Sequence, residues 1–238
     1  MLKAKNLKSN FIKDKNICKK IINQTKIYKN IILEIGPGYG FLTDIILESY
    51  PKKIYLVEKD RELVSILKTK YRNNKNIIII EKDILKYDLS NFKNLIIISN
   101  LPYNVSTKII LHLFNFNMNI LEMILMVQRE VALKFNYNLS NMNKYKFINK
   151  LVSNFSICFD VSPNVFIPKP KVISTVVKFE LKKKNIDFEK INLFTNLIFK
   201  NIRKKISNNI RFKKKENLIN KRVNELTIDD LLKIYNLF

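Results

Sequence analysis

The stretch Glu34-Ile35-Gly36-Pro37-Gly38-Tyr39-Gly40 holds all three glycines of this 238-residue chain. Average glycine usage of roughly 7% would scatter about sixteen through such a length. A chain that otherwise avoids glycine but clusters it here needs a turn whose backbone no side chain obstructs. The apolar run Ile31–Ile35 ends in this turn, and Phe41–Leu47, which has a helical pattern, follows it. This order predicts backbone N–H groups and a helix N-terminus that face a nucleotide-like ligand. The alternative is a tight turn that binds nothing.

Beyond this turn, short β-rich runs alternate with helical patterns through the first half of the chain. Near-continuous apolar strands separated by helices are typical of a parallel sheet covered on both faces. Two later runs, Phe155–Val161 and Thr175–Leu181, have no helical pattern between them, and we expect them to pair antiparallel at the end of the same sheet. The other predicted strands are 31–35, 54–58, 77–80, 95–99 and 123–127, and the predicted helices are 42–49, 63–71, 107–116 and 130–135.

The character of the sequence changes at about Lys182. The run Lys182–Asn185 is polar and is interpreted as a hinge, and the segment after it is helical and basic, without proline or glycine. We therefore predict two domains: a sheet domain over residues 1–183 and a small helical domain over residues 184–238.

The charge of the chain points to a polyanionic partner. Its 44 Lys and Arg against 20 Asp and Glu give a formal charge of +24. Basic proteins bind nucleic acid by neutralising phosphates and releasing counterions. AT-rich codons are an alternative source of lysine, but they do not explain so large a deficit of acidic residues. The composition therefore favours contact with nucleic acid.

Several other classes of function are disfavoured by composition. Cys18 and Cys158 are far apart with no C-x-x-C pair, which suggests neither a disulfide framework nor a zinc site. His112 is the only histidine, so histidine-rich metal sites and Ser-His-Asp chemistry are nearly excluded. The sequence has neither a membrane-length apolar run nor a signal-peptide core, so we expect a metal-free, soluble protein of the cytoplasm.

The spacing of the glycines and two acids predict the ligand. A dinucleotide loop would place its third glycine at position 41, where Phe41 stands, so G-x-G-x-G favours S-adenosylmethionine over NAD. Gly36 and Gly38 are then cofactor-binding positions, with the ligand too close to Gly38 for a side chain.

The two acids follow the second and third predicted strands. Glu58 is placed to accept hydrogen bonds from ribose hydroxyls. Asp83 is placed to accept from an adenine amine, with Ile84 beside the ring. A solvated strand-end acid and a turn-forming aspartate are the alternatives.

The most specific motif is Asn100-Leu101-Pro102-Tyr103, directly after the fourth predicted strand. The Asn100 side-chain carbonyl and the Leu101 backbone carbonyl can accept both hydrogens of an exocyclic amine, which directs its lone pair toward a methyl donor. Pro102 stiffens the turn, and the face of the Tyr103 ring, rather than its hydroxyl, is expected to hold the base. The alternative is an ordinary turn before a helix.

Two further regions suit RNA. Phe166-Ile167-Pro168-Lys169-Pro170-Lys171 puts an aromatic ring on a stiff loop beside two lysines, which suits stacking on a flipped base. The alternative is a rigid connector. Arg203–Lys205 and Arg211–Lys215 are basic clusters that we interpret as RNA contacts rather than merely solvated helix faces.

Together these motifs resemble the ribosomal RNA adenine dimethyltransferase family, whose members dimethylate two adjacent adenines near the 3′ end of small-subunit rRNA. The resemblance covers nearly the whole chain. The stretch Lys8–Asp14 is similar to the family's N-terminal segment that contacts the methyl donor, and this similarity implies cofactor contacts at Asn10 and Ile12. The stretches are Lys8–Asp14, Glu34–Thr43, Val57–Asp60, Asn100–Thr107, Val127–Ala132, Phe166–Ser174, Arg203–Lys205 and Lys221–Leu226.

The resemblance implies an α/β fold: a class I, Rossmann-like methyltransferase sheet with a small helical C-terminal domain. It implies an enzyme that uses S-adenosylmethionine and contributes to ribosome biogenesis. Its catalytic residues would be Asn100–Tyr103 and Phe166, with Asn100 also touching the cofactor. The expected partner is small-subunit rRNA or a pre-ribosomal small subunit, and the expected state is a monomer.

The chain departs from the family pattern at four positions. Lys8 and Ser9 replace Gly-Gln, Lys82 replaces the glycine before Asp83, and Ser99 replaces the glycine before Asn100. None of these residues is assigned a chemical role.

Two other functions remain open. An erythromycin-resistance methylase, which modifies one adenine of large-subunit rRNA, shares the cofactor loop and a similar proline-rich segment. Asn-Leu-Pro-Tyr rather than Asn-Ile-Pro-Tyr, together with Val127–Ala132, favours the small-subunit enzyme. A non-catalytic RNA-binding assembly factor of the same fold is the other alternative, and the intact Glu58, Asp83, Asn100 and Tyr103 argue against it.

Overall fold

The computed structural model describes residues 11–139, 141–210 and 217–238, and a seven-stranded sheet lies at its centre. The strand order is β4-β3-β2-β5-β6-β9-β7. Neighbours from β4 to β6 are parallel, whereas β9 pairs antiparallel with both β6 and β7. The predicted α/β sheet and its antiparallel end are therefore confirmed. The strands are β2 (Ile31–Ile35), β3 (Lys53–Glu58), β4 (Ile77–Glu81), β5 (Leu95–Asn100), β6 (Ile120–Gln128), β7 (Ser153–Val161) and β9 (Ser174–Leu181).

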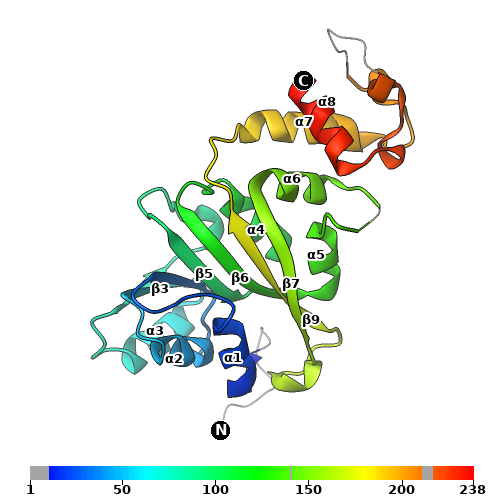
Figure 1. The fold of residues 1–238 in the computed structure, drawn as a ribbon. Helices are drawn as coiled ribbons and strands as arrows, with labels where there is room; N and C mark the ends of the chain where they lie inside the picture. The colour runs from blue at the N-terminus through cyan, green and yellow to red at the C-terminus, as the bar shows by residue number, and fades with distance from the viewer. Residues whose placement is uncertain (1–10, 140, 211–216) are drawn as a thin grey trace.

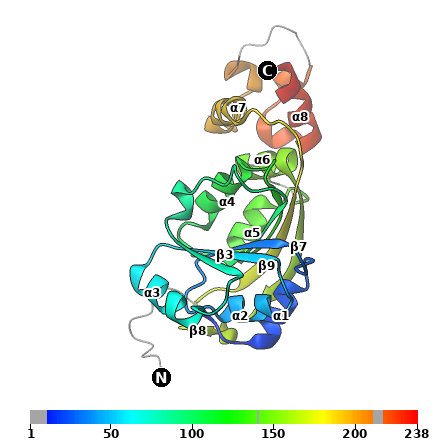
Figure 2. The same cartoon turned by 90° about the vertical axis from the view of Figure 1, so that its left-hand side faces the viewer.

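Helices cover both faces of the sheet (Figures 1 and 2): α1, α2 and α3 lie on one side, and α4, α5 and α6 on the other. The run that forms β5 is apolar throughout because helices cover both faces of this strand. Ile96 and Ile98 pack with Ile45 of α2, whereas Ile97 packs with Ile109 of α4, because successive side chains point to opposite faces. The helices are α1 (Lys15–Ile22), α2 (Phe41–Leu47), α3 (Arg61–Lys70), α4 (Ser106–Phe114), α5 (Arg129–Phe135) and α6 (Lys144–Val152).

The N-terminal segment adds elements that the sequence analysis does not predict. Strand β1 (Phe11–Ile12) pairs antiparallel with β8 (Phe166–Ile167) in a separate two-stranded sheet. Helix α1 follows because the Asp14 carboxylate accepts hydrogen bonds from the backbone N–H of Asn16 and Ile17, at 2.8 and 3.2 Å. The capping aspartate and the apolar spacing after it are the sequence signals for this helix.

The C-terminal segment packs on α6 through a cluster of aromatic rings. Helices α7 (Phe188–Lys200) and α8 (Ile228–Leu237) lie beyond α6, away from α1–α3 (Figure 1). The fully buried ring of Phe147 in α6 lies 5.2 Å from the ring of Phe194 and 5.7 Å from that of Tyr235, between centroids. The C-terminal helices therefore share their core with a helix of the sheet domain. The division at residues 183 and 184 stays a prediction.

The segment that the sequence suggests is a hinge is fastened to the sheet domain. The Asn117 side-chain amide donates to the carbonyls of Lys182 and Lys184, at 2.8 and 2.7 Å. The Lys183 ammonium donates to the Ile120 carbonyl at 2.7 Å. Of the helices in the described part of the chain, none is both long and apolar enough to cross a membrane.

Candidate functional site

The strand order reverses between β2 and β5, and this point defines the candidate site. Strands β3 and β4 lie on one side of β2, and β6 lies beyond β5, all parallel. The carboxyl ends of these strands therefore meet at one edge, where open α/β sheets bind their ligands. The glycine turn (Gly36–Gly40) follows β2 and the Asn100 turn (Asn100–Tyr103) follows β5, so two motifs far apart in sequence become neighbours.

The glycine turn has a backbone that other residues adopt poorly. Gly36 and Gly38 have φ angles of 62° and 59°. Among the described residues other than Gly36 and its two chain neighbours, no heavy atom lies within 4 Å of the place that a Cβ at Gly36 would occupy. A Cβ at Gly38 would instead collide with the ring of Phe11. The ring of Phe11 thus occupies the space beside Gly38, and a close approach of the ligand to Gly38 stays a prediction. The open side of the turn is at Gly36.

Glu58 connects the end of β3 to the glycine turn. Its carboxylate is buried and accepts hydrogen bonds from three backbone N–H groups: Gly38 at 3.3 Å, Lys59 at 2.9 Å and Asp60 at 3.1 Å. A carboxylate has about four acceptor positions, so capacity remains for a ligand hydroxyl. The solvated strand-end alternative does not hold for this side chain.

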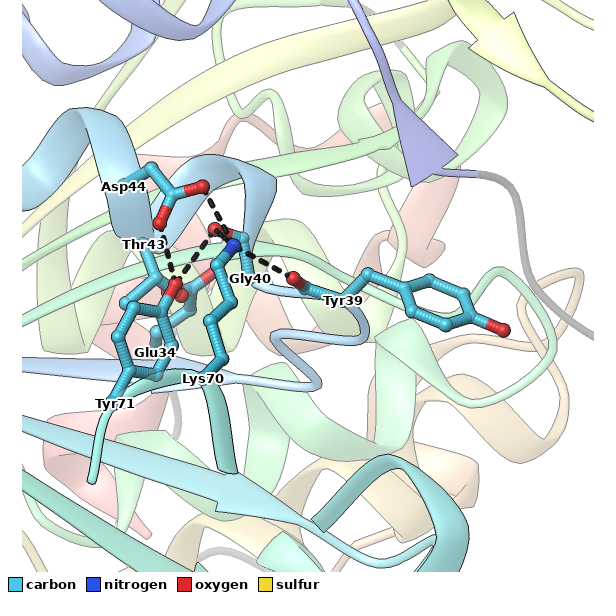
Figure 3. A network of polar contacts seen from close by, with 7 residues as sticks. All are labelled: Glu34, Tyr39, Gly40, Thr43, Asp44, Lys70 and Tyr71. Carbon is cyan, nitrogen blue, oxygen red and sulfur yellow. Dashed lines mark hydrogen bonds and ion pairs between the residues drawn. The ribbon is translucent and has the colours of Figure 1, made fainter. Parts of the chain in front are cut away.

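The end of α3 holds the far side of the glycine turn, as Figure 3 shows. The Lys70 ammonium donates to the carbonyls of Tyr39 and Gly40 at 3.0 and 3.2 Å and pairs with Asp44 at 2.6 Å. The Tyr71 hydroxyl donates to the same Gly40 carbonyl at 2.9 Å and lies 2.8 Å from Asp44. We call Lys70 and Tyr71 the α3 clamp. The sequence analysis assigns these two residues no role.

Glu34 lies under the turn and is fully buried. Its carboxyl accepts a hydrogen bond from the Thr43 hydroxyl at 2.6 Å. Burial raises the pKa of Glu34 to about 8, and the negative charges of Asp44 and Glu58 act in the same direction, while Thr43 and Lys70 oppose them. The acid at the start of the glycine motif is thus neutral through most of the physiological range.

Asp83 follows β4 and begins a short 3₁₀ turn (Ile84–Lys86). Its carboxylate accepts a hydrogen bond from the Leu85 N–H at 3.0 Å, which is the turn-forming role. Ile84 is 5% exposed and packs in the core. A single bond from Leu85 leaves acceptor capacity on the Asp83 carboxylate, so an adenine contact at this residue stays a prediction.

Ser99 joins the two motifs directly. Its hydroxyl is buried and donates to the Ile35 carbonyl, just before Gly36, at 2.6 Å. The next residue, Asn100, ends β5, and the Leu101 N–H bonds to the Met126 carbonyl at 3.0 Å. Ser99 therefore supplies a hydrogen bond between the glycine turn and the Asn100 turn.

The Asn100 turn is also fastened across the sheet. The hydroxyls of Tyr103 and Ser174 share a hydrogen bond of 2.6 Å. Pro102 accepts at its carbonyl from the Val105 N–H at 3.3 Å, which closes the turn before α4. The sequence analysis places Ser174 only at the end of a motif and gives it no contact.

Phe166 lies in β8 opposite Ile12, and both side chains are buried in the core beside α1 and α2. Only 2% of Phe166 is exposed, so its ring offers no face to a base in this conformation. A stacking role for Phe166 stays a prediction that requires the ring to become accessible. Ile12 is likewise part of the core, and its cofactor contact is untested.

Some predicted residues fall outside the described part of the chain: Asn10 and the basic run 211–215. The other basic cluster, Arg203–Lys205, is exposed between α7 and the C-terminal turns. Among the described residues, no group of three or more His, Cys, Asp or Glu side chains could hold a metal ion.

Comparison with known proteins places this geometry among rRNA methyltransferases. A sequence model of a family described as ribosomal RNA adenine dimethylase matches residues 2–238. A protein of Malacoplasma penetrans named ribosomal RNA small subunit methyltransferase A is 39% identical over 217 residues, 87% of this chain and 78% of its own length. The protein of the same name from Hydrogenobaculum sp. strain Y04AAS1 is 35% identical over 243 residues, 99% of this chain and 94% of its own length.

Solved structures agree. A dimethyladenosine transferase from Plasmodium falciparum superposes with a TM-score of 0.80 at 25% identity, covering 94% of this chain and 95% of its own. The 23S rRNA methyltransferase ErmE superposes with a TM-score of 0.77, covering 95% of this chain and 98% of its own. At 16% identity, the second likeness shows the fold alone.

Proposed function

This chain belongs to the ribosomal RNA adenine dimethylase family, and we propose that it dimethylates the N6 amines of two adjacent adenines near the 3′ end of small-subunit rRNA. The observation that carries the proposal is the position of Asn100-Leu101-Pro102-Tyr103 at the carboxyl end of β5, beside the glycine turn of β2. The two turns are joined by the Ser99–Ile35 hydrogen bond. A methyl donor and an amine would therefore be held side by side.

The residues on the cofactor side fit S-adenosylmethionine. The space beside Gly36 is open, and Glu58 keeps acceptor capacity for ribose hydroxyls. Asp83 is assigned to the adenine amine. When bound, the cofactor supplies a methyl group on a positively charged sulfur. Glu58 and the backbone of the glycine turn, at the carboxyl ends of β3 and β2, would hold the cofactor.

The target adenine leaves its stack and presents its amine to the Asn100 turn. The side-chain carbonyl of Asn100 and the backbone carbonyl of Leu101 accept its two hydrogens, which directs the nitrogen lone pair toward the donor. As the new bond forms, positive charge develops on the nitrogen, and both carbonyl oxygens stabilise it. The alkylated amine is acidic and releases its proton without a strong general base. Tyr103 holds the base by its ring face.

The relatives named for the small subunit favour this substrate over large-subunit rRNA, since the likeness to ErmE is one of fold. A non-catalytic role is disfavoured because the carboxylate of Glu58 and the Asn100 turn are both in place. We propose that the enzyme is a cytoplasmic monomer and that its partner is small-subunit rRNA or a pre-ribosomal small subunit.

Methyl transfer to purified ribosomal particles tests the function. The protein is incubated with small or large subunits and S-adenosylmethionine, and modified nucleotides are mapped by mass spectrometry. The proposal predicts two adjacent dimethyladenines in the small-subunit RNA. Modification of the large subunit alone would identify the resistance-type methylase, and no transfer by the folded protein would favour the assembly factor.

The basic cluster Arg203–Lys205 is proposed to contact RNA phosphates. Neutralising all three residues should reduce the slope of log affinity against log salt by about two, because each phosphate contact releases counterions. Neutralising three exposed lysines of the sheet domain (Lys52, Lys68 and Lys75) is the matched control and should leave the slope nearly unchanged. If the slope of log affinity against log salt is the same for both triple variants, the RNA contact is contradicted, and AT-rich codons become the favoured source of these lysines.

A further inference from the structure

A buried hydrogen bond connects strand β9 with the Asn100 turn. Ser174 is the first residue of β9 and is fully buried, and its hydroxyl oxygen lies 2.6 Å from that of Tyr103. The two residues are 71 positions apart, and in the sheet β6 lies between β9 and β5, the strand that the Tyr103 turn follows. The bond therefore fastens the Asn100 turn to the antiparallel end of the sheet.

Ser174 is itself held on both sides. The Arg129 N–H donates to the carbonyl of Ile173 at 3.1 Å. On the other side, the Thr175 hydroxyl donates to the Asp160 carboxylate at 2.6 Å, and that carboxylate lies 3.6 Å from the Arg129 guanidinium. Ser174 is also in register with Gln128 of β6 and Val161 of β7. The backbone around the serine is thus held by β6, β7 and the start of α5.

Tyr103 is restrained at both of its ends. Its backbone carbonyl accepts a hydrogen bond from the Ser106 hydroxyl at 3.2 Å, at the start of α4. Its ring ends in the hydroxyl that bonds to Ser174. A side chain fixed at the backbone and at the tip has little rotational freedom left, so little is lost when a base packs against the ring.

We propose that Ser174 is a positioning residue that fixes the ring of Tyr103 for the target adenine. The proposal rests on the proposed function, because it takes Tyr103 as the residue that holds the base. It assigns the Tyr103 hydroxyl a role that the sequence does not reveal: the hydroxyl orients the ring and does not touch the reacting amine. Holding a reactant near its reactive geometry raises the rate of the chemical step.

A double-mutant cycle on single-turnover methyl transfer tests this role. Ser174→Ala and Tyr103→Phe each remove one end of the bond, and each should slow transfer about fivefold with saturating cofactor and rRNA, the value of one hydrogen bond. The double variant should be no slower than the single variants, because both remove the same interaction. Losses that multiply in the double variant would overturn the proposal, as would full rates in both single variants.

Controls separate positioning from general damage. Both variants should keep the cofactor affinity of the unmodified protein, measured by calorimetry, and Ser65→Ala in α3 should keep its transfer rate. If Ser174→Ala does not fold, Tyr103→Phe decides, because it leaves β9 unchanged. A fivefold loss then supports the proposal, and an unchanged rate overturns it. Absence of transfer by the unmodified protein would instead contradict the proposed function.

Discussion

The glycine turn after β2 and the Asn100 turn after β5 lie at the same edge of the sheet. The residues that bond to the glycine turn are closer to it in sequence than the residue that bonds to the Asn100 turn. Glu58, Lys70 and Tyr71 hold the glycine turn: Glu58 ends β3, Lys70 ends α3 and Tyr71 directly follows α3. The Asn100 turn reaches Ser174 near the end of the sheet domain. Under the proposed function, binding of the cofactor therefore depends on structure close in sequence, whereas capture of the base depends on the completed sheet.

This difference makes the two sides separable by mutation. Changes around the glycine turn should act on cofactor affinity, and changes around the Asn100 turn should act on methyl transfer. Ser99 is the exception, because its hydrogen bond to the Ile35 carbonyl belongs to both sides.

Glu58→Ala should weaken S-adenosylmethionine binding at least tenfold, about 1.4 kcal/mol. The change removes the proposed ribose acceptor and leaves three backbone N–H groups without their carboxylate. Calorimetry measures the affinity, and Glu62→Ala, an exposed acid in the same region, is the control. Unchanged affinity in a folded Glu58→Ala protein would remove Glu58 from the cofactor site.

Lys70→Met should weaken cofactor binding about fivefold, since the α3 clamp then holds the turn through Tyr71 alone. The expected loss is smaller because Lys70 touches the carbonyls of the turn and is not assigned to the ligand. Lys68→Met, on an exposed position of the same helix, is the matched comparison. If both variants bind equally well, the clamp does not shape the turn.

The smallest effect is expected at Glu34, whose titration should make the free energy of unfolding depend on pH. Its pKa is raised from 4.5 to about 8, so the folded state holds a proton that the unfolded state releases within this window. The unfolding free energy should therefore fall as the pH rises from about 4.5 to 8. Glu34→Gln should lose less stability between pH 6 and pH 8 than the unmodified protein does. Denaturant titrations at both pH values measure this, with exposed Glu48→Gln as control; parallel losses in all three proteins would contradict it.

The sequence predicted most of the fold because the strands are buried on both faces and are apolar throughout. Strand 31–35 was placed at its exact ends, and the others within a few residues. Helices α1 and α6 were not predicted, although Asp14 and Asn143 cap them with ordinary signals. Neither helix lies between two of the predicted parallel strands, so the alternation that indicates the other helices is missing there.

The candidate site was predictable where one local pattern defines it. The positive φ of Gly36 and the acid at Glu58 follow from spacing alone. The Tyr103–Ser174 bond does not, because it depends on which strand lies beyond β6. The burial of Phe166 is not predictable either, because its partner Ile12 lies in a strand of only two residues, which leaves no sequence pattern.

Asn100 is proposed to act on the transition state of methyl transfer and not on assembly of the complex. In single-turnover methyl transfer with saturating cofactor and rRNA, Asn100→Ala should have a rate at least a hundredfold lower, roughly 2.7 kcal/mol, with cofactor and RNA affinity nearly unchanged. Asn115→Ala, at the other end of α4, should keep its rate. Near-normal transfer by Asn100→Ala would contradict the mechanism and the adenine assignment that depends on it.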